Sequence, residues 1–262
     1  MKFFKATAAV VLSLTMAFGF AGCAKPAEES APADAEGEVK TFKIATDTTF
    51  APFEFEDESG KFVGIDMDLL NAIADDQGFK VDLQVLGFNA AVQALEAGQA
   101  DGVIAGMSIT EERQQKFDFS DPYFDSGVVM GIATGNEDVK EYKDLKGKKV
   151  AVKTGTEGST FAESIKDEFG FELVTFDDSN SMYQDVIVGN SVACFEDYPV
   201  MGYAITQGVG LKIITEMEAG NSYGFAVGKG KNAELLKMFN EGYKNVVESG
   251  KYQEILDTYI QK

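Results

Sequence analysis

Hydrophobic and polar residues alternate along the chain in two rhythms, one typical of strands and one typical of helices. In the first part of the chain, short apolar runs are separated by longer stretches with apolar residues every three or four positions. This pattern predicts strands at 41–46, 81–86 and 102–105, and helices at 66–78 and 89–97. Strands that alternate with helices favour an α/β fold with parallel sheets.

The predicted helix at 66–78 carries its own start and stop signals. Asp66 can cap the helix by accepting a backbone hydrogen bond, and Gly78 can end it in a left-handed conformation. Between them, Leu69, Leu70 and Ile73 form an apolar stripe that we expect to face the core.

The same rhythm starts again in the second half of the chain. It predicts strands at 149–152, 171–176 and 192–195, and helices at 161–169 and 179–188. Both halves also contain the series helix, short polar turn, strand and polar strand end. We therefore expect two lobes of the same kind.

The last part of the chain, a strand at 223–227 and helices at 232–248 and 252–260, is too small to form a domain alone. We expect it to return to the first lobe, so that the chain crosses between the lobes twice. The predicted organisation is lobe 1 at 40–122 plus 223–262, lobe 2 at 127–217, and hinges near 123–126 and 218–222.

The N-terminus has the features of an export signal. Lys2 and Lys5 precede an uncharged apolar stretch that ends in small residues, which predicts a lipoprotein signal peptide at 1–22. Phe20-Ala21-Gly22-Cys23 resembles a bacterial lipobox, which implies lipidation of Cys23; a free thiol or an uncleaved anchor is the alternative. Residues 23–39, rich in Ala, Pro and Glu, are expected to form a disordered tether.

Composition excludes several classes of protein. The 23 basic and 43 acidic residues give a formal net charge of −20, which argues against binding to nucleic acid or to an anionic lipid surface. With no histidine and two cysteines, the chain cannot build a Ser-His pair, a His-ligated metal site or a zinc ribbon. We expect no catalytic residues, no metal and no cofactor, and little change in ligand affinity between about pH 6 and 8.

One arginine, Arg113, stands against 22 lysines. Its planar guanidinium can bind a carboxylate through two parallel hydrogen bonds, which a lysine cannot do. A compositional bias toward lysine is the alternative explanation, so the surroundings of Arg113 decide between the two.

Polar and aromatic residues gather where the predicted strands end, which is the edge at which open α/β sheets bind ligands. Singly, each has a structural explanation: Asp197 can cap the next helix, and the phenylalanines can belong to the core. Together they predict a pocket for an amino-acid zwitterion. The candidate residues are Asp47, Phe50, Phe88, Gly106, Ser108, Arg113, Lys153, Thr156 and Asp197.

From about Thr41 to Ile260 the chain resembles the substrate-binding proteins of polar amino-acid ABC transporters, close to the glutamine binders. The resemblance implies the type II periplasmic-binding-protein fold, in which two hinge strands join lobes that close on a ligand. The motifs that carry it are Asp47-Thr48-Thr49-Phe50-Ala51-Pro52-Phe53, Gly64-Ile65-Asp66-Met67-Asp68-Leu69, Gly106-Met107-Ser108-Ile109-Thr110-Glu111-Glu112-Arg113, Phe117-Asp118-Phe119-Ser120-Asp121-Pro122-Tyr123 and Val152-Lys153-Thr154-Gly155-Thr156.

The resemblance also implies roles for these residues, matched position by position. Arg113, Gly106 and Ser108 would bind the ligand carboxylate, and Asp197 the ammonium, with Thr156 helping from the second lobe. Phe50 and Phe88 would form aromatic walls, and Asp47 and Lys153 would meet the ligand side chain. The chain departs from the family at Val192, where an aspartate is usual, and Glu196 stands at a variable position.

Asp47 and Lys153 favour an uncharged ligand side chain. An amide can donate to the carboxylate and accept from the ammonium, whereas a cationic side chain would meet Lys153 in a dry site. Glutamine is the preferred ligand, followed by other polar amino acids or cystine. Arginine or lysine becomes the ligand only if Glu196 points inward and Lys153 swings out. A prephenate- or arogenate-type dehydratase with Glu196 as acid is the enzymatic alternative.

The expected partners follow from the same resemblance. We expect the protein to be a monomer and not to be an enzyme. It would bind a free L-amino acid and deliver it to the permease subunits of an ABC importer. A lipid anchor on Cys23 would hold it on the extracytoplasmic face of a bacterial cell membrane.

Overall fold

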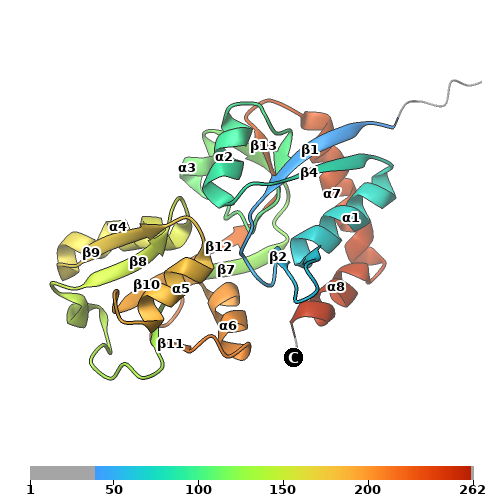
Figure 1. The fold of residues 1–262 in the computed structure, drawn as a ribbon. Helices are drawn as coiled ribbons and strands as arrows, with labels where there is room; N and C mark the ends of the chain where they lie inside the picture. The colour runs from blue at the N-terminus through green and yellow to red at the C-terminus, as the bar shows by residue number, and fades with distance from the viewer. Residues whose placement is uncertain (1–38, 261–262) are drawn as a thin grey trace, which may run out of the picture. The chain divides into compact units, whose positions relative to one another are not determined.

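The computed structural model describes residues 39–260, which form two α/β lobes (Figure 1). The first lobe is built on a sheet with the strand order β4-β1-β5-β13-β6. In this sheet β1, β4 and β5 are parallel, and β13 runs antiparallel to both β5 and β6. The strands are β1 (Thr41–Thr46), β4 (Lys80–Val85), β5 (Gly102–Val103), β6 (Phe117–Phe119) and β13 (Ala226–Gly228).

The second lobe repeats this topology. Its sheet has the order β11-β7-β10-β8-β9, in which β8, β9 and β10 are parallel and β7 is antiparallel to β10 and β11. The expected α/β class and the two similar lobes are confirmed. The strands are β7 (Phe124–Ala133), β8 (Lys149–Lys153), β9 (Glu172–Phe176), β10 (Ala193–Asp197) and β11 (Leu211–Ile213).

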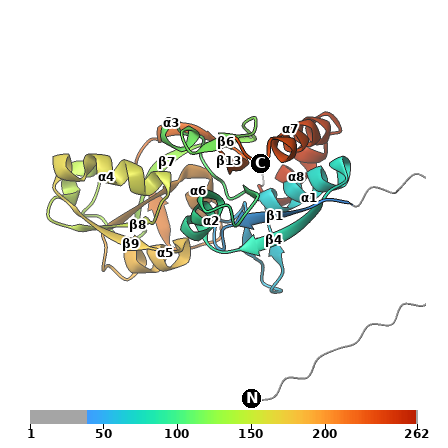
Figure 2. The same ribbon diagram turned by 90° about the horizontal axis from the view of Figure 1, so that it is seen from above.

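Helices cover both faces of the first sheet. On one face α1 (Ile65–Gln77) packs against α7 (Ala233–Glu248) and α8 (Lys251–Tyr259), which Figure 2 shows side by side. On the other face α2 (Phe88–Glu96) packs against β1, β5 and β13. The short α3 (Glu111–Gln114) precedes β6. The two C-terminal helices therefore lie on the lobe that the N-terminal strand begins.

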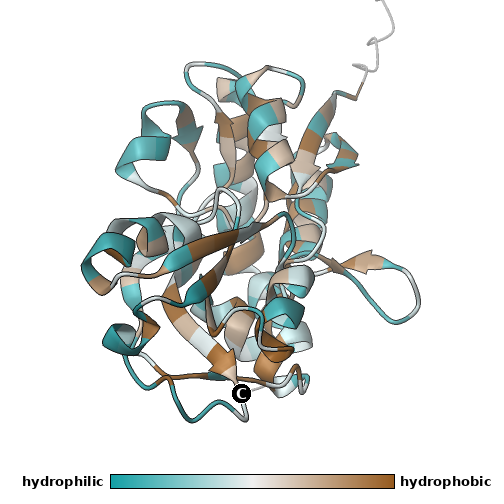
Figure 3. Cartoon of the chain, turned by 60° about the vertical axis from the view of Figure 1, so that its left-hand side comes forward, coloured by the Kyte–Doolittle hydropathy of each residue, from teal (hydrophilic) through white to brown (hydrophobic). Residues whose placement is uncertain are grey.

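The second sheet is covered in the same way. A short 3-10 helix, η1 (Tyr142–Leu145), and α4 (Glu157–Phe169) share one apolar cluster, whereas α5 (Ser179–Ile187) and α6 (Tyr198–Thr206) share another on the opposite face. Figure 3 shows hydrophobic stretches along the strands and mixed hydrophobic and hydrophilic bands along the helices, as one-sided packing requires.

Two antiparallel strands connect the lobes. β12 (Glu218–Tyr223) pairs with the first half of β7, and Tyr223 also bridges to Ser108 of the first lobe. Figure 1 shows β7 and β12 between the two sheets. A small hairpin, β2 (Phe55–Glu56) with β3 (Phe62–Val63), adds a third, two-stranded sheet, and Phe55 contacts Tyr203 of α6 across the lobes.

The start of α1 differs from the prediction. Gly64, not Asp66, is the N-cap, with a φ of 139° that glycine tolerates, and a Cβ there would lie 2.0 Å from the Phe53 carbonyl oxygen. The prediction that Asp66 caps the helix was wrong, because its buried carboxylate binds groups from distant segments instead. The predicted end is confirmed, since Gly78 is a left-handed C-cap.

The predicted strand at 223–227 is two strands. β12 ends at Tyr223 and β13 begins at Ala226, so the chain passes from one sheet to the other at Gly224 and Phe225. A Cβ on Gly224 would lie 2.9 Å from the Ile109 side chain, which explains the glycine at this crossing. Local periodicity cannot distinguish one continuous strand from two that belong to different sheets.

Several predictions fall outside the described residues. They are the signal peptide at 1–22, the lipidation of Cys23 and all of the tether at 23–39 except its last residue. From Ile65 to Tyr259, none of the described helices combines the length and apolar character that a membrane span needs.

Candidate ligand-binding site

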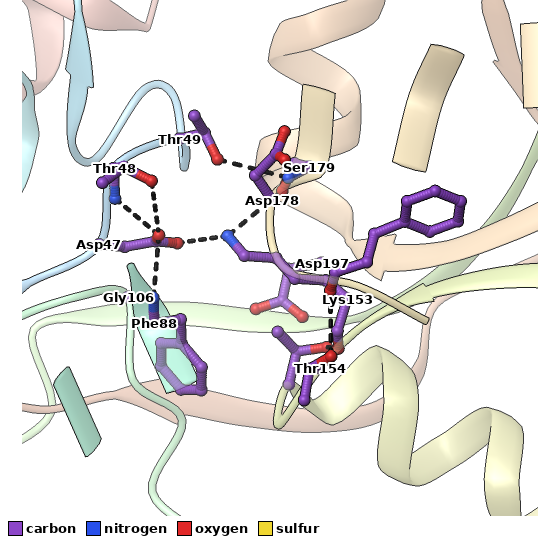
Figure 4. A network of polar contacts seen from close by, with 12 residues as sticks. Asp47, Thr48, Thr49, Phe88, Gly106, Lys153, Thr154, Asp178, Ser179 and Asp197 are labelled. Carbon is purple, nitrogen blue, oxygen red and sulfur yellow. Dashed lines mark hydrogen bonds and ion pairs between the residues drawn. The ribbon is translucent and has the colours of Figure 1, made fainter. Parts of the chain in front are cut away.

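Asp47 and Lys153, which follow corresponding strands of the two lobes, form an ion pair between them. Both side chains are only 1% exposed. The other Asp47 oxygen, Oδ1, accepts hydrogen bonds from the backbone nitrogens of Thr48 (2.6 Å) and Phe88 (3.0 Å). Lys153 Nζ also donates to Ser179 Oγ at 3.4 Å (Figure 4). The structure thus brings together the two residues expected to meet a ligand side chain.

Arg113 lies at the other end of the site and also reaches across the lobes. Its Nη1 donates to the Ser108 carbonyl (2.9 Å) and its Nη2 to the Gly155 carbonyl (3.0 Å). Glu157 Oε1 of α4 lies 3.4 Å from Nη2. Burial lowers the pKa of the guanidinium, and Glu157 opposes this shift. Arg113 is therefore a largely buried cation held in the site, not part of a solvated helix face.

The two predicted aromatic walls each lie beneath a cation. The Arg113 guanidinium carbon is 5.3 Å from the centroid of the Phe88 ring, and Lys153 Nζ is 5.0 Å from that of Phe50. Both rings are buried, and Phe50 also contacts the rings of Phe53 and Tyr223. The two rings thus belong to the core, and their role as walls of a ligand pocket stays a prediction.

Asp197 ends β10 with one carboxylate oxygen available. Its Oδ2 accepts a 2.5 Å hydrogen bond from the Tyr223 hydroxyl, which itself accepts one from Ser126 Oγ. Oδ1 is buried and has no donor among the residues that the structure describes. Although α6 follows directly, Asp197 makes no side-chain capping bond. Burial and Glu196 raise its pKa to about 7, against the lowering effects of Tyr223 and Arg113.

Glu196 precedes Asp197 and binds groups of its own lobe. Its Oε2 accepts hydrogen bonds from the hydroxyls of Ser179 (2.9 Å) and Tyr183 (3.2 Å), and its Oε1 from the Asp197 backbone nitrogen (3.0 Å). Burial raises the pKa of Glu196, and the nearby Lys153 ammonium opposes the shift. Glu196 is thus engaged with β10 and α5.

The remaining predicted residues are all buried. They are Gly106, Ser108 and Thr156. The Gly106 nitrogen donates to Asp66 Oδ2 (2.8 Å), so Gly106 can offer a ligand only its carbonyl oxygen. The Thr156 hydroxyl donates to the Lys153 carbonyl (2.8 Å) and accepts from the Ser159 nitrogen as the N-cap of α4. Within residues 39–260 the Ser108 hydroxyl makes no hydrogen bond, so it is available to a ligand carboxylate.

Four residues of the site were missed by sequence reasoning. Tyr223 orients Asp197, Ser179 joins Lys153 to Glu196, Thr49 accepts from the Ser179 nitrogen at 3.3 Å, and Glu157 pairs with Arg113. A weak signal existed for Glu157 and Ser179, because both start helices that follow strand ends. Nothing in the sequence pointed to the Tyr223 hydroxyl.

Within residues 39–260, no three Asp, Glu or Cys side chains lie together in a way that could hold a metal ion. The charges of the site are instead arranged as pairs of opposite sign, which suits a small solute that carries both signs itself.

Two similar lobes that meet over buried charged residues define a protein that binds a small polar solute between them. Comparison with known families agrees. The model of the bacterial extracellular solute-binding proteins, family 3, matches residues 42–262. The chain belongs to this family.

Individual relatives are similar over most of the chain. A probable histidine-binding protein from Neisseria gonorrhoeae is 32% identical over 238 residues, covering 89% of this chain and 88% of the relative. Substrate binding domain 2 of Lactococcus lactis GlnP, solved in an open conformation, is 41% identical, with a TM-score of 0.59 and coverage of 85% and 96%. An ancestral arginine-binding protein bound to glutamine is 37% identical, with a TM-score of 0.79 and coverage of 86% and 100%.

The two structural similarities differ in an informative way. The open domain has the higher identity but a TM-score of 0.59, whereas the glutamine-bound protein has a TM-score of 0.79. As a whole, this chain is therefore more similar in structure to the bound protein than to the open domain. The contacts of Lys153 with Asp47 and of Arg113 with Gly155, which both cross between the lobes, agree with that similarity.

Proposed function

We propose that this protein binds a free polar L-amino acid outside the cytoplasm and delivers it to an ABC importer, with glutamine as the preferred ligand. Membership of the family supports solute binding. Relatives named for the binding of histidine, arginine and cystine support an amino acid as the solute.

The main chain of an amino acid fits the end of the site that Arg113 and Asp197 form. Arg113 donates from Nη1 and Nη2 to backbone carbonyls, and each of these nitrogens carries a second N–H that a carboxylate can accept from. The Ser108 hydroxyl lies in the same loop. Asp197 Oδ1 is a buried acceptor without a donor among the described residues, which suits an ammonium group. All three of these residues, Arg113, Ser108 and Asp197, are among the site residues predicted from the sequence.

The observation that carries the choice of side chain is the ion pair of Asp47 and Lys153, 1% exposed and adjacent to the Phe50 ring. An amide can accept from Lys153 and donate to Asp47 without adding charge. A cationic side chain would lie beside the Lys153 ammonium in a dry environment, which costs free energy. Glutamine satisfies both partners, and arginine satisfies only Asp47.

The experiment that tests this proposal is a thermal-shift panel of the twenty amino acids and cystine. The protein, with Cys23 removed, is unfolded and refolded first to strip carried-over ligand. Ligand at 1,000 times its Kd adds about 4 kcal/mol to the free energy of unfolding. For a chain of this size the expected rise in Tm is on the order of 10 °C.

Each outcome of the panel has a definite meaning. A large shift with glutamine supports both the proposed ligand and the role of the Asp47–Lys153 pair. A shift with arginine or lysine alone keeps amino-acid binding and contradicts the charge argument. No shift with any ligand contradicts the proposal and leads to assays for dehydration of prephenate-like compounds, with Glu196 as the candidate acid.

We also propose that Cys23 carries a lipid that anchors the protein at the membrane. The support is the lipobox-like sequence Phe20-Ala21-Gly22-Cys23 after a charged and then apolar N-terminus. Metabolic labelling with a radioactive fatty acid should mark the wild-type protein but not Cys23→Ala. Equal labelling of both would contradict lipidation at this residue.

A further inference from the structure

Lobe 1 buries two carboxyl groups, those of Glu54 and Asp66, that the proposed ligand contacts do not use. Both residues are 0% exposed. Glu54 ends the turn that carries Phe50, with backbone hydrogen bonds between these two residues in both directions. Asp66 lies in the first turn of α1. Three of their four carboxyl oxygens lack a donor among the residues that the structure describes, and this requires an explanation.

Asp66 connects the ligand site to the start of a connecting strand. Its Oδ2 accepts from the Gly106 nitrogen (2.8 Å) and from the Tyr123 hydroxyl (2.9 Å). Gly106 has a φ of 51° and lies two residues before Ser108, whose carbonyl holds Arg113. Tyr123 immediately precedes β7. One carboxylate oxygen therefore fixes the loop that would bind a ligand carboxylate relative to the point where the chain leaves lobe 1.

The other oxygens of the two acids lack donors. Oε1 and Oε2 of Glu54 and Oδ1 of Asp66 have no donor among the residues that the structure describes. The Asp66 nitrogen donates to the carbonyl of Phe53 (2.9 Å), the residue before Glu54, so the two acids lie on neighbouring segments. Their interaction raises the pKa of Glu54 and lowers that of Asp66. Two adjacent buried carboxylates cannot both ionise without a large cost, so the pair holds a proton.

The surroundings determine which acid holds that proton. Asp66 accepts two hydrogen bonds and lies at the positive end of the α1 dipole, and both features stabilise its charge. Glu54 has neither. We propose that Glu54 is a neutral hydrogen-bond donor to Asp66, and that this acid pair positions the Gly106–Ser108 loop for binding the ligand carboxylate. The inference rests on the proposed function, because it deepens the carboxylate end of that site.

The other charged and titratable groups around Glu54 are consistent with a neutral side chain. Asp47, after β1, raises the pKa of Glu54, and Lys153 of β8 lowers it less than burial and Asp66 raise it. The Lys153 ammonium is already paired with Asp47. Tyr123 is itself buried, and Glu54 and Asp66 raise its pKa, so its hydroxyl remains a donor. The pKa of Asp66 is about 6, which leaves it ionised at neutral pH.

Two substitutions at Glu54 separate a neutral donor from a buried anion. Glu54→Gln keeps a donor of the same length that cannot ionise, whereas Glu54→Leu keeps similar bulk and removes the donor. Glu56→Gln is the matched control, because Glu56 is exposed two residues away. Glutamine affinity is measured by calorimetry at neutral pH, with the protein folded. The Gly106 amide shift and the ¹³C shift of labelled glutamate carboxyls are followed by NMR without ligand.

The expected result is a glutamate carboxyl that is still protonated at pH about 7 and whose signal disappears in Glu54→Gln. Glu54→Gln should bind glutamine within about twofold of the wild type and keep the Gly106 amide shift. Glu54→Leu should shift the Gly106 amide and lose about tenfold in affinity, the scale of one hydrogen bond to a charged group. Glu56→Gln should change neither signal.

Three results would overturn the inference. They are a Glu54 carboxyl that is ionised at neutral pH, an affinity loss in Glu54→Gln as large as that in Glu54→Leu, or a Gly106 amide that neither variant moves. If the wild-type protein binds no amino acid, the proposed function fails. The two NMR readouts, which need no ligand, still decide whether the acid pair exists and holds Gly106.

Discussion

Each lobe buries a pair of acids near the site, and the two pairs differ in what surrounds them. Glu54 and Asp66 of lobe 1 contact each other inside the core, and the described residues offer three of their oxygens no donor. Glu196 and Asp197 of lobe 2 end a strand, where hydroxyls of Ser179, Tyr183 and Tyr223 donate to them.

This difference separates a scaffold pair from a recognition pair. In lobe 2, Lys153 lowers the pKa of Glu196 and Arg113 lowers that of Asp197, so cations of the site offset part of the desolvation. In lobe 1, a proton shared within the pair takes the place of external donors. Burial is the same for both pairs, so it cannot show which role a carboxyl group has. That role is inferred from the hydrogen-bond donors and the cations around the group.

The largest expected effect is at Arg113, the cation next to the recognition pair. Arg113→Lys keeps the charge but loses the two-pronged donor geometry. Because a hydrogen bond to a charged group contributes about 1.5–3 kcal/mol, glutamine affinity should fall at least about tenfold, and further in Arg113→Ala. Titration calorimetry measures both. Lys116→Ala, at an exposed base nearby, should have no effect; unchanged affinity in Arg113→Lys would remove Arg113 from the site.

The next effect is a pH dependence that distinguishes the two pairs. Asp197 has a pKa of about 7 and binds an ammonium only when ionised, so affinity should fall about tenfold between about pH 8 and 6. This differs from the flat profile expected of a chain without histidine. Asp197→Asn should bind weakly at every pH, and Glu196→Gln should move the fall in affinity to lower pH, because the Glu196 charge raises the pKa of Asp197. A flat wild-type profile would contradict the role of Asp197.

The stability of the ligand-free protein should change with pH in the opposite direction. Because the folded-state pKa of Asp197 is raised from 3.8 to about 7, its protonated form favours folding. This contribution is fully present below pH about 4 and is lost as the pH rises through about 7. Denaturant unfolding at several pH values measures it against Asp197→Asn, which lacks the titrating group. Equal slopes in both proteins would show that Asp197 does not titrate in this range.

Lys153→Met should change ligand preference more than total affinity. It removes the ammonium that opposes a cationic side chain and leaves Asp47 to accept from one. On the scale of about 0.5–1.5 kcal/mol for a neutral hydrogen bond, glutamine should lose two- to tenfold, and arginine should gain relative to it. Competition between the two ligands gives the ratio directly. Lys212→Met, at a partly exposed lysine of lobe 2, should leave the ratio unchanged. If Lys153→Met leaves the ratio unchanged, the Asp47–Lys153 pair does not determine ligand specificity.

The smallest expected effect is at Glu196. Glutamine at this position can accept the same hydroxyl hydrogen bonds from Ser179 and Tyr183, so Glu196→Gln should change glutamine affinity by less than about threefold. Calorimetry against wild type measures this. A tenfold change, or loss of an arginine response, would show that Glu196 faces the ligand after all.

The repeating αβ rhythm and the strand-end clusters could be predicted from sequence because both are local. Periodicity predicts the strands β1 and β8. Asp47 directly follows β1, and Lys153 is the last residue of β8. Their pairing spans 106 positions, and no local pattern encodes it. The same holds for Asp66, whose capping role was plausible from neighbours but whose real partners, Gly106 and Tyr123, lie 40 and 57 positions away.

Burial was the other quantity that the sequence could not supply. The near-neutral pKa of Asp197 arises from desolvation and from Glu196 beside it, and neither effect follows from an aspartate before Tyr-Pro. The split between β12 and β13 was missed for a related reason. The residues on either side are equally apolar, and only the arrangement of two sheets shows that they belong to different ones.

The position of β13 between β5 and β6 has a consequence for the order in which the chain can fold. The second lobe uses one continuous stretch, Phe124 to Tyr223, and can complete its sheet as soon as that stretch is available. In the first sheet, β6 has no strand to pair with until β13 (Ala226–Gly228) has been made. Helix α1 likewise lacks its packing partners until α7 and α8 have been made. The half of the molecule that begins first is thus the half whose sheet is completed last, after the C-terminal segment has been made.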